Sequence, residues 1–244
     1  MLGVARSTVA RAFEAQTVVR FLERAQTGPA GLVVDGEAGI GKTTLILDAR
    51  DEAASRGFEV LSAQGSPAEV TYAYAAVADL VRDVDAATLE TLPAVQRVAL
   101  HRACVGDMAG PATNERAVAT AFMSVIERLS AHSPVLLAVD DAQWLDASSR
   151  MVIGFTTRRL TGRVGMLLTF RTGDPQSVDA RTWLQFPEPD TLTTVVIQPL
   201  SLGGVHAVVA ARLGRSLPRP AITRIHEISG GNPLFFSLLD FMAS

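Results

Sequence analysis

The sequence feature that most constrains the fold is a glycine-rich octapeptide, GEAGIGKT, at residues 36–43. It matches the pattern G-x-x-x-x-G-K-[ST] in full. Apolar residues 31–34 precede it, and a helical pattern follows from about Lys42 to Ala54, so the octapeptide is the turn between a buried strand and a helix. Glycines let the backbone curl until successive N–H groups point at an anion, and the helix N-terminus adds its dipole. The pattern therefore predicts a phosphate-binding loop.

We expect this loop to bind ATP together with Mg²⁺. Lys42 can reach the β- and γ-phosphates, and Thr43 offers a hydroxyl ligand for Mg²⁺. Glu37 is expected to face solvent, because only its backbone is needed in the loop. The expected nucleotide contacts of the loop are Gly36, Glu37, Ala38, Gly39, Ile40, Gly41, Lys42, Thr43 and Thr44. The alternative, a glycine-rich turn that matches by chance, does not explain why the loop joins a strand to a helix.

A second candidate feature is a pair of carboxylates that follows an apolar strand. Residues 135–139, VLLAV, predict a buried strand, and Asp140 and Asp141 come directly after it. Ligands bind at the carboxyl edge of open α/β sheets, so Asp140 is placed to hold Mg²⁺ through water. Asp141 is placed to orient or deprotonate the water that attacks the phosphate. The alternative is a strand that ends in a solvated acidic turn.

An arginine ends another predicted strand, LLTFR at residues 167–171. Because parallel strands end at the same edge of a sheet, Arg171 is expected beside Asp140, where its guanidinium can contact the γ-phosphate. An ordinary surface arginine is the alternative. Together with Lys42 and Asp141, Arg171 completes the candidate catalytic set.

Predicted strands and helices alternate over the first 199 residues. Strands are expected near 31–34, 58–61, 135–139, 164–170 and 191–197, and helices near 12–26, 42–54, 72–84, 114–129 and 146–160. This alternation favours an α/β fold with a parallel sheet covered on both faces. After Pro199 only short helices are expected, near 201–213, 218–228 and 233–243. We therefore predict a nucleotide-binding core at 1–199 and a partial helical lid at 200–244, with 65–113 the least readable stretch.

Composition excludes several classes of protein. The 244 residues are 48% hydrophobic and 19% charged, which suits a packed core rather than a disordered chain. The net charge of -3 gives no bulk attraction to nucleic acid, so no direct nucleic-acid contact is expected. Cys104 is the single cysteine, which fits the reducing conditions of a cytoplasmic location. No apolar run is long enough for a membrane span or a secretory signal. The four histidines show no metal-ligand spacing.

Four segments, taken in order, resemble one family. GEAGIGKTT, VLLAVDDAQWLD, LLTFRTGD and SGGNPLFF are similar to the ATPase module of the large LuxR-type transcriptional regulators. These regulators belong to the STAND class of signalling ATPases, which are relatives of AAA+ proteins. The resemblance covers residues 9–243, where 9–14, VARAFE, resemble a V-G-R-x-x-E motif with Ala10 in place of the usual glycine.

The resemblance implies a five-stranded P-loop NTPase sheet of order 5-1-4-3-2, with a helical lid behind the nucleotide. By position, Arg171 falls on the family's sensor segment, and the resemblance therefore supports its expected contact with the γ-phosphate. Pro233, in the Gly-Asn-Pro lid motif, would pack against adenine, and Arg11 would lie beside the base.

Departures from the wider AAA+ pattern favour a switch over a motor. No arginine or lysine follows Pro233, so the sensor arginine that AAA+ proteins carry in the lid is missing. We therefore expect slow ATP hydrolysis that resets a switch between an ATP state and an ADP state. The chain stops at Ser244, inside the expected lid. The expected partners are therefore other domains of a larger regulator, including its DNA-binding domain. Nucleotide-dependent self-association is a further possible interaction. The alternatives are an active AAA+-like remodeller, with Arg158, Arg159 or Arg181 acting on a neighbouring subunit, and a non-catalytic interaction module.

Overall fold

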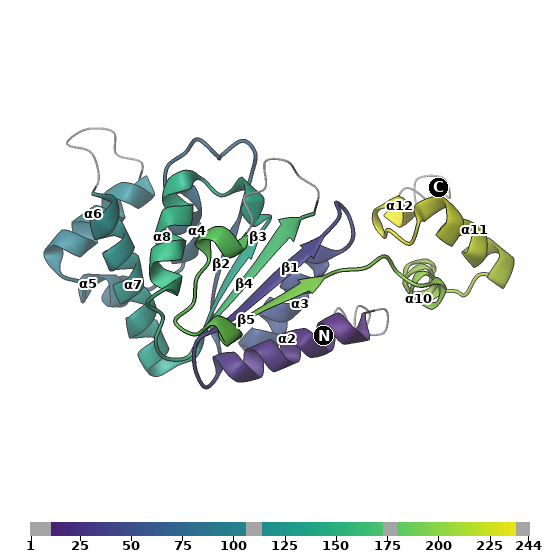
Figure 1. The fold of residues 1–244 in the computed structure, drawn as a ribbon, viewed down its shortest axis with the longest axis horizontal. Helices are drawn as coiled ribbons and strands as arrows, with labels where there is room; N and C mark the ends of the chain where they lie inside the picture. The colour runs from purple at the N-terminus through teal and green to yellow at the C-terminus, as the bar shows by residue number, and fades with distance from the viewer. Residues whose placement is uncertain (1–10, 106–113, 173–179, 238–244) are drawn as a thin grey trace.

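The computed structural model describes residues 11–105, 114–172 and 180–237 (Figure 1). A five-stranded sheet runs through its centre, in the order β2-β3-β4-β1-β5, with every neighbouring pair parallel. Read from the other edge, this is the predicted order 5-1-4-3-2, which is confirmed. The strands are β1 (Ala30–Gly36), β2 (Glu59–Gln64), β3 (Val135–Asp140), β4 (Val164–Arg171) and β5 (Leu192–Val196).

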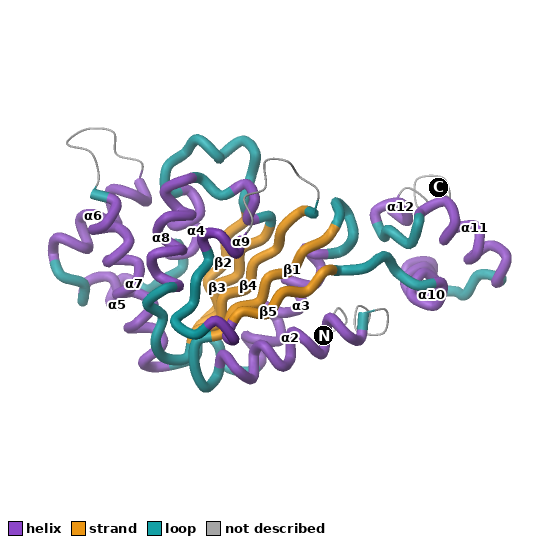
Figure 2. Tube along the Cα trace, viewed as in Figure 1, coloured by secondary structure: helices purple, strands orange, loops and turns teal. Residues whose placement is uncertain are grey.

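The central strands are apolar because both faces of the sheet are covered. Every residue of β3 is buried, and its side chains alternate between two separate cores. Leu137 and Val139 point into one core, whereas Leu136 and Ala138 point into the other. Figure 2 shows the strands between two helical layers. This placement leaves the carboxyl ends of the central strands as the edge from which a ligand can reach the sheet.

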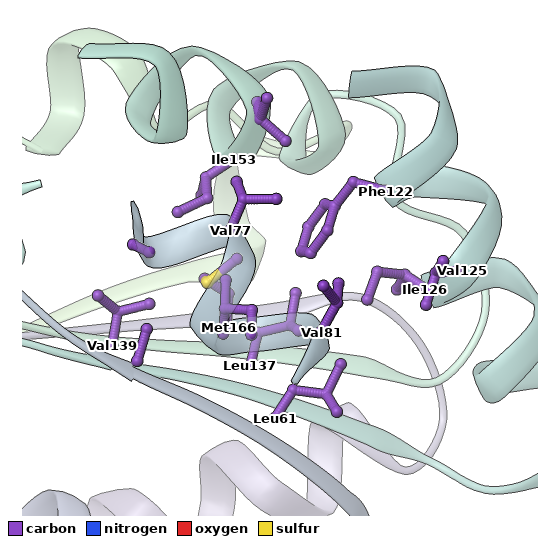
Figure 3. Packing of buried hydrophobic residues seen from close by; sticks show 14 of the residues in the cluster. Leu61, Val77, Val81, Phe122, Val125, Ile126, Leu137, Val139, Ile153 and Met166 are labelled. Carbon is purple, nitrogen blue, oxygen red and sulfur yellow. The ribbon is translucent and has the colours of Figure 1, made fainter. Parts of the chain in front are cut away.

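Different helices cover the two faces. One face packs against α2 (Ala12–Ala25) and α3 (Lys42–Ser55), through side chains such as Phe21 and Ile46. The other packs against α4 (Ala75–Val81), α7 (Glu115–His132) and α8 (Ala147–Thr157), where Phe122 of α7 is fully buried (Figure 3). The short α5 (Ala86–Glu90) and α6 (Ala94–Val105) lie against α7 at the end of the molecule away from β5 (Figure 1).

The predicted helices and strands agree with the structure best where hydrophobic periodicity and capping coincide. Asp146 caps α8 as predicted, and its Oδ1 accepts a hydrogen bond of 2.8 Å from the Ser149 N–H. The same oxygen accepts a 2.8 Å bond from the N–H of Tyr74, whose φ of 64° is left-handed. The helix predicted at 72–84 is therefore shorter, because α4 begins only after this tied turn.

The least readable stretch contains two helices that the sequence did not predict. Neither α5 nor α6 shows a strong apolar stripe: α5 has no buried residue, and Leu100 and Ala103 are the buried residues of α6. Periodicity fails there because these helices contact other helices rather than the sheet. The remaining short elements are η1 (Ala142–Trp144), α9 (Ala180–Trp183) and η2 (Pro189–Thr191).

Three helices follow β5 and form a separate group beyond the carboxyl ends of the strands (Figure 1). They are α10 (Leu202–Leu213), α11 (Arg219–Ser229) and α12 (Leu234–Ser237). Leu200, Val205, Val209 and Ile222 form a small core of their own. The last predicted helix, 233–243, extends beyond the described residues after 237. Among the described helices, none has both the length and the apolar character that crossing a bilayer requires.

Candidate functional site

The glycine-rich loop curls tightly between β1 and α3. Gly39 and Gly41 have φ of 73° and 106°, in the left-handed region that side chains with a Cβ rarely adopt. A Cβ on Gly39 would also overlap the side chain of Leu234 in α12. The loop ends at Lys42, the first residue of α3, so the unpaired N–H groups of a helix N-terminus open into it.

Lys42 lies inside the curl of the loop. Its side chain is buried, and Nζ donates hydrogen bonds to the carbonyl oxygens of Gly36 at 2.8 Å and Glu37 at 2.9 Å. Burial lowers the pKa of Lys42, although the charge of Asp141 acts in the opposite direction. Glu37 is exposed, as predicted. The ammonium group is therefore held by backbone oxygens at the position where an anion would enter the loop.

Thr43 and Asp140 meet at the carboxyl edge of the sheet. The Thr43 hydroxyl Oγ1 donates a 2.8 Å hydrogen bond to Oδ2 of Asp140, which is itself buried. The other carboxylate oxygen, Oδ1, accepts hydrogen bonds from the hydroxyl of Thr169 on β4 and, at 3.1 Å, from the N–H of Asp141. The loop, β3 and β4 thus converge on one carboxylate.

Asp141 turns sharply away from the end of β3. Its φ is 51°, and its N–H is held by Thr169 Oγ1 at 2.8 Å. Gly65, after β2, leaves no room for a Cβ against the carbonyl oxygen of Asp141, so the neighbouring loop also supports this turn. A left-handed residue other than glycine is strained and persists where its surroundings hold it, as they do here.

Gln143 is a site residue to which the sequence motifs assigned no role. Its Nε2 donates a 2.8 Å hydrogen bond to Oδ1 of Asp141, and its Oε1 accepts a 3.1 Å bond from the N–H of Arg171. The side chain is buried and bridges the ends of β3 and β4. The available signal was its place two residues after the paired carboxylates, but only the three-dimensional position shows that it contacts both strands.

Arg171 lies at the end of β4, on the same edge as Asp140, as predicted. Its charge is close enough to lower the pKa of Lys42, after the larger effects of burial and Asp141. Its Nε is buried and has no hydrogen-bond partner within the described part of the chain. A buried guanidinium nitrogen without an acceptor is the donor that a bound anion would satisfy.

Arg11 connects the loop to the segment that leads into α10. Its Nη2 donates to the carbonyl of Ile40 at 2.5 Å, and its Nη1 donates to the carbonyl of Gln198 at 3.1 Å. Nη1 also pairs with Glu14 at 3.2 Å. Burial lowers the pKa of this arginine, and Glu14 opposes that shift. Arg11 was expected beside the base of the nucleotide. In the structure its guanidinium contacts the backbone of the loop. Val9 and Ala10, the other residues of that motif, lie outside the described residues.

The α10–α12 group touches the loop directly. Asn232, buried just before α12, donates from Nδ2 to the carbonyl of Ala38 at 3.0 Å. Its Oδ1 accepts a 3.0 Å bond from the N–H of Leu234, whose side chain packs over Gly39. Pro233 lies between them and is half-buried. The helical group is therefore attached to the phosphate loop through the side chains of Asn232 and Leu234.

The donor set suits a magnesium nucleotide. No three or more histidine, cysteine or acidic residues of the described ranges gather in a way that could hold a metal by themselves. Mg²⁺ in phosphate-binding sites keeps several waters and takes only one or two protein oxygens besides the phosphates. Thr43 Oγ1 and Asp140 Oδ2, which lie 2.8 Å apart, are oxygens of this kind.

Solved structures share this fold at low sequence identity. A STAND protein with a tetratricopeptide repeat sensor from Pyrococcus horikoshii matches with a TM-score of 0.54 and 14% identity over 89% of this chain and 28% of its own. AMPPCP-bound DnaA from Aquifex aeolicus gives 0.50 and 16%, over 89% and 56%. The Aeropyrum pernix ORC1 protein, solved in complex with DNA, gives 0.52 and 15%, over 84% and 49%. The chain thus spans between about a quarter and somewhat more than half of these proteins.

No curated protein matches the chain. A family of sequences does: the AAA ATPase domain family matches residues 7–169. That range includes the phosphate loop, the carboxylates after β3 and most of β4, and it covers more than half of the chain. The matched range contains Lys42, Thr43 and Asp140, which the structure brings together at the carboxyl edge of the sheet. The chain belongs to the AAA ATPase domain family.

Proposed function

We propose that this chain is an ATP-dependent signalling switch, in which ATP and ADP favour different arrangements of the sheet core and the α10–α12 lid. The observation that carries the proposal is the 3.0 Å hydrogen bond from Asn232 to the carbonyl of Ala38. A nucleotide that reshapes the phosphate loop changes the acceptor that holds the lid. A ligand shifts such an equilibrium only through its different affinities for the two states, so ATP and ADP must bind them unequally.

In this proposal the loop residues 36–44 bind the phosphates, with Lys42 Nζ exchanging its carbonyl partners for phosphate oxygens. Thr43 and Asp140 are the residues that would hold Mg²⁺, which neutralises phosphate charge when bound. The buried Nε of Arg171 supplies a further donor to the γ-phosphate. On the lid side, Pro233 is proposed to contact adenine, and Arg11 fixes the loop on that side through the carbonyl of Ile40.

Hydrolysis is proposed to be slow and to depend on Asp141. Its carboxylate can orient the attacking water or accept its proton, with Gln143 holding Oδ1 in place at 2.8 Å. No lysine or arginine stands after Pro233 on α12 to add charge from the lid. The product ADP lacks the γ-phosphate and so lacks the group that Arg171 would contact. Hydrolysis would therefore reset the switch.

We also propose a biological context for this switch. The motif resemblance supports membership in a LuxR-type transcriptional regulator, and the STAND protein that shares the fold carries a tetratricopeptide repeat sensor. Other domains of such a regulator are the proposed partners, and DNA contact is assigned to them because this chain carries a net charge of -3.

The nucleotide site can be tested through an unusual property of the sequence. Lys42 is the only lysine of the chain, so an ATP-derived acyl phosphate should acylate one side chain. We expect ATP with Mg²⁺ to protect Lys42, and we expect Thr43→Ala to weaken that protection at least about tenfold through loss of the metal ligand. Arg20→Gln, on the exposed side of α2, is the matched control. Absence of Lys42 labelling and of ATP binding would show that the fold no longer binds nucleotide.

The switch itself requires a comparison of ATP and ADP. We expect different dissociation constants for the two nucleotides and different amide exchange rates in α10–α12. Equal affinities with identical exchange would contradict the switch while leaving nucleotide binding intact. Brisk turnover that rises with protein concentration and falls in Arg159→Ala would instead favour a remodelling ATPase that acts between subunits.

A further inference from the structure

A cavity lies away from the phosphate loop, among α4, α5 and α6. Its volume is about 520 Å³, within the range of small-molecule sites in proteins. Its walls are largely apolar and include Val81, Leu89, Leu92 and Leu100. These side chains offer no hydrogen bonds to water, so a water molecule beside them would be poorly stabilised. An apolar body of about ten carbon atoms would be favoured there over water.

Two arginines and a histidine stand where the cavity meets the surface. Arg82, Arg97 and His101 line it, against Glu90 as the single carboxylate. Arg97 Nη1 donates to the carbonyl of Glu90 at 3.2 Å, so this arginine is held by a backbone oxygen rather than by the carboxylate. The Arg82 side chain is 70% exposed. Arg82 is shared with Asp79, so Arg97 is the arginine that offers its charge to an anionic group at the rim.

Cys104 does not turn the cavity into a reactive site. Its thiol lines the wall, and burial raises its pKa to about 11. The thiol stays protonated and neutral at physiological pH, and a neutral thiol behaves as a small apolar group. Cys104 therefore extends the apolar wall, and as the only cysteine it also provides a chemical reporter for this cavity.

Arg82 links this cavity to the nucleotide site. It also lines a more polar cavity of about 340 Å³ whose walls include Thr43 and Asp140. On that side Arg82 forms an ion pair with Asp79, which lines the same polar cavity. An anion at the rim of the apolar cavity would compete with Asp79 for the guanidinium. The charge next to Thr43 and Asp140 would then change.

We propose that the cavity among α4, α5 and α6 binds a small amphipathic anion, with an apolar body in the cavity and a carboxylate on Arg82 and Arg97, and that Arg82 couples this site to the metal side of the nucleotide site. Binding does not depend on the proposed nucleotide function, whereas the coupling rests on it.

Decanoate is a suitable probe, and its neutral counterpart decanol is the test of charge. Titration calorimetry on the purified chain without nucleotide should show saturable binding of one decanoate per chain. Arg97→Gln should weaken decanoate at least about tenfold and leave decanol nearly unchanged, since a charge-assisted hydrogen bond is worth about that factor. Arg20→Gln is the matched control. Bound decanoate should also slow alkylation of Cys104 at pH 9, which places it in this cavity.

A second variant separates loss of the site from loss of the fold. Ala86 is exposed and lines the cavity, so Ala86→Phe should fill it without disturbing the buried core. We expect this variant to unfold at the temperature of the parent chain and to bind decanoate at least about tenfold more weakly. Absence of decanoate binding in the parent chain, or binding that Ala86→Phe leaves unchanged, would overturn the site. Equal effects of Arg97→Gln on the binding of decanoate and decanol would overturn the proposal that the site recognises an anion.

The coupling has its own readout. Decanoate should change the affinity for ATP with Mg²⁺, and ATP should change the affinity for decanoate by the same factor, because linkage between two sites is reciprocal. Asp79→Asn removes the competing carboxylate and should abolish this mutual effect while decanoate still binds. Decanoate binding without mutual effect would overturn the coupling alone. Failure of ATP binding, by contrast, would overturn the proposed function and leave the decanoate result standing.

Discussion

At the scale of single residues, a few hydrogen bonds connect the end of β3 to the end of β4. Thr169 joins Asp140 to the N–H of Asp141, and Gln143 joins the carboxylate of Asp141 to the N–H of Arg171. Thr169 and Gln143 are both buried, so water competes little for these bonds. The candidate catalytic carboxylate is thus oriented by its neighbours rather than left mobile at the surface.

The bridging role of Gln143 predicts a specific kinetic effect. Gln143→Ala leaves Asp141 without its side-chain donor, so ATP turnover should fall about tenfold while ATP affinity changes less than about threefold. Measured kcat and ATP dissociation constants check this, with the exposed Gln16→Ala as control. A merely structural role would lower the melting temperature and weaken ATP binding together.

The variant Gln143→Glu provides a second readout of the same role. It places a carboxylate against Asp141, and a like charge raises the pKa of a carboxyl group. The acidic limb of the pH–rate profile should therefore move to higher pH, because Asp141 must be ionised to act on water. An unchanged profile would contradict contact between these two side chains during turnover.

At the scale of elements, one buried carboxylate organises the helices beside the site. Asp146 caps α8 through the Ser149 N–H, and it also holds the N–H of Tyr74, where α4 begins. Ser149 in turn accepts a 3.2 Å bond from the N–H of Val77 in α4. The starts of α4 and α8 are therefore fastened together, although they are about seventy residues apart in the sequence.

Asp146→Ala should lower the free energy of unfolding by about 2–4 kcal/mol, since it removes a helix cap and leaves two buried N–H groups unpaired. Asp146→Asn retains the accepting oxygen and should lose less. Chemical denaturation measures both. Asp85→Ala removes the exposed cap of α5 and should have a smaller effect than Asp146→Ala. Equal losses at the two caps would show that the second bond to Tyr74 contributes nothing.

At the scale of the whole molecule, the described part of the α10–α12 group meets the sheet core mainly beside the phosphate loop. Asn232 reaches the carbonyl of Ala38, Leu234 packs over Gly39, and Arg11 holds both the loop and the carbonyl of Gln198. The α10–α12 group has its own small core around Val205 and Ile222. A helical group with its own core and few outside contacts can move as a unit.

Asn232→Ala should loosen the lid of the nucleotide-free chain. Loss of its hydrogen bond to Ala38 should speed amide exchange in α11 and α12 by about threefold to tenfold, while exchange in β3 and β4 stays unchanged. Arg224→Ala, on the exposed side of α11, is the control for a change within the lid itself. Unchanged exchange in Asn232→Ala would indicate that Leu234 and Arg11 hold the lid without this bond.

Sequence patterns predicted the features that depend on neighbours along the chain. The loop at 36–43, the buried strand at 135–139 and the cap at Asp146 each combine local periodicity with residues whose backbone or side-chain chemistry allows few conformations. Local patterns did not predict α5 and α6, because their few buried residues contact other helices and leave no regular stripe. The sheet order followed from the resemblance to a family rather than from the strands themselves.

By itself, the sequence determined which groups the protein can offer: a curled phosphate loop with Lys42 and Thr43, carboxylates at the end of an apolar strand, and an arginine at the end of another. Only the tertiary structure decided which of them touch. It placed Gln143 between Asp141 and Arg171, and it brought Asn232 against the carbonyl of Ala38. The physical reason is that strand ends and loop carbonyls become neighbours only after parallel pairing and helix packing have brought together segments far apart in the chain.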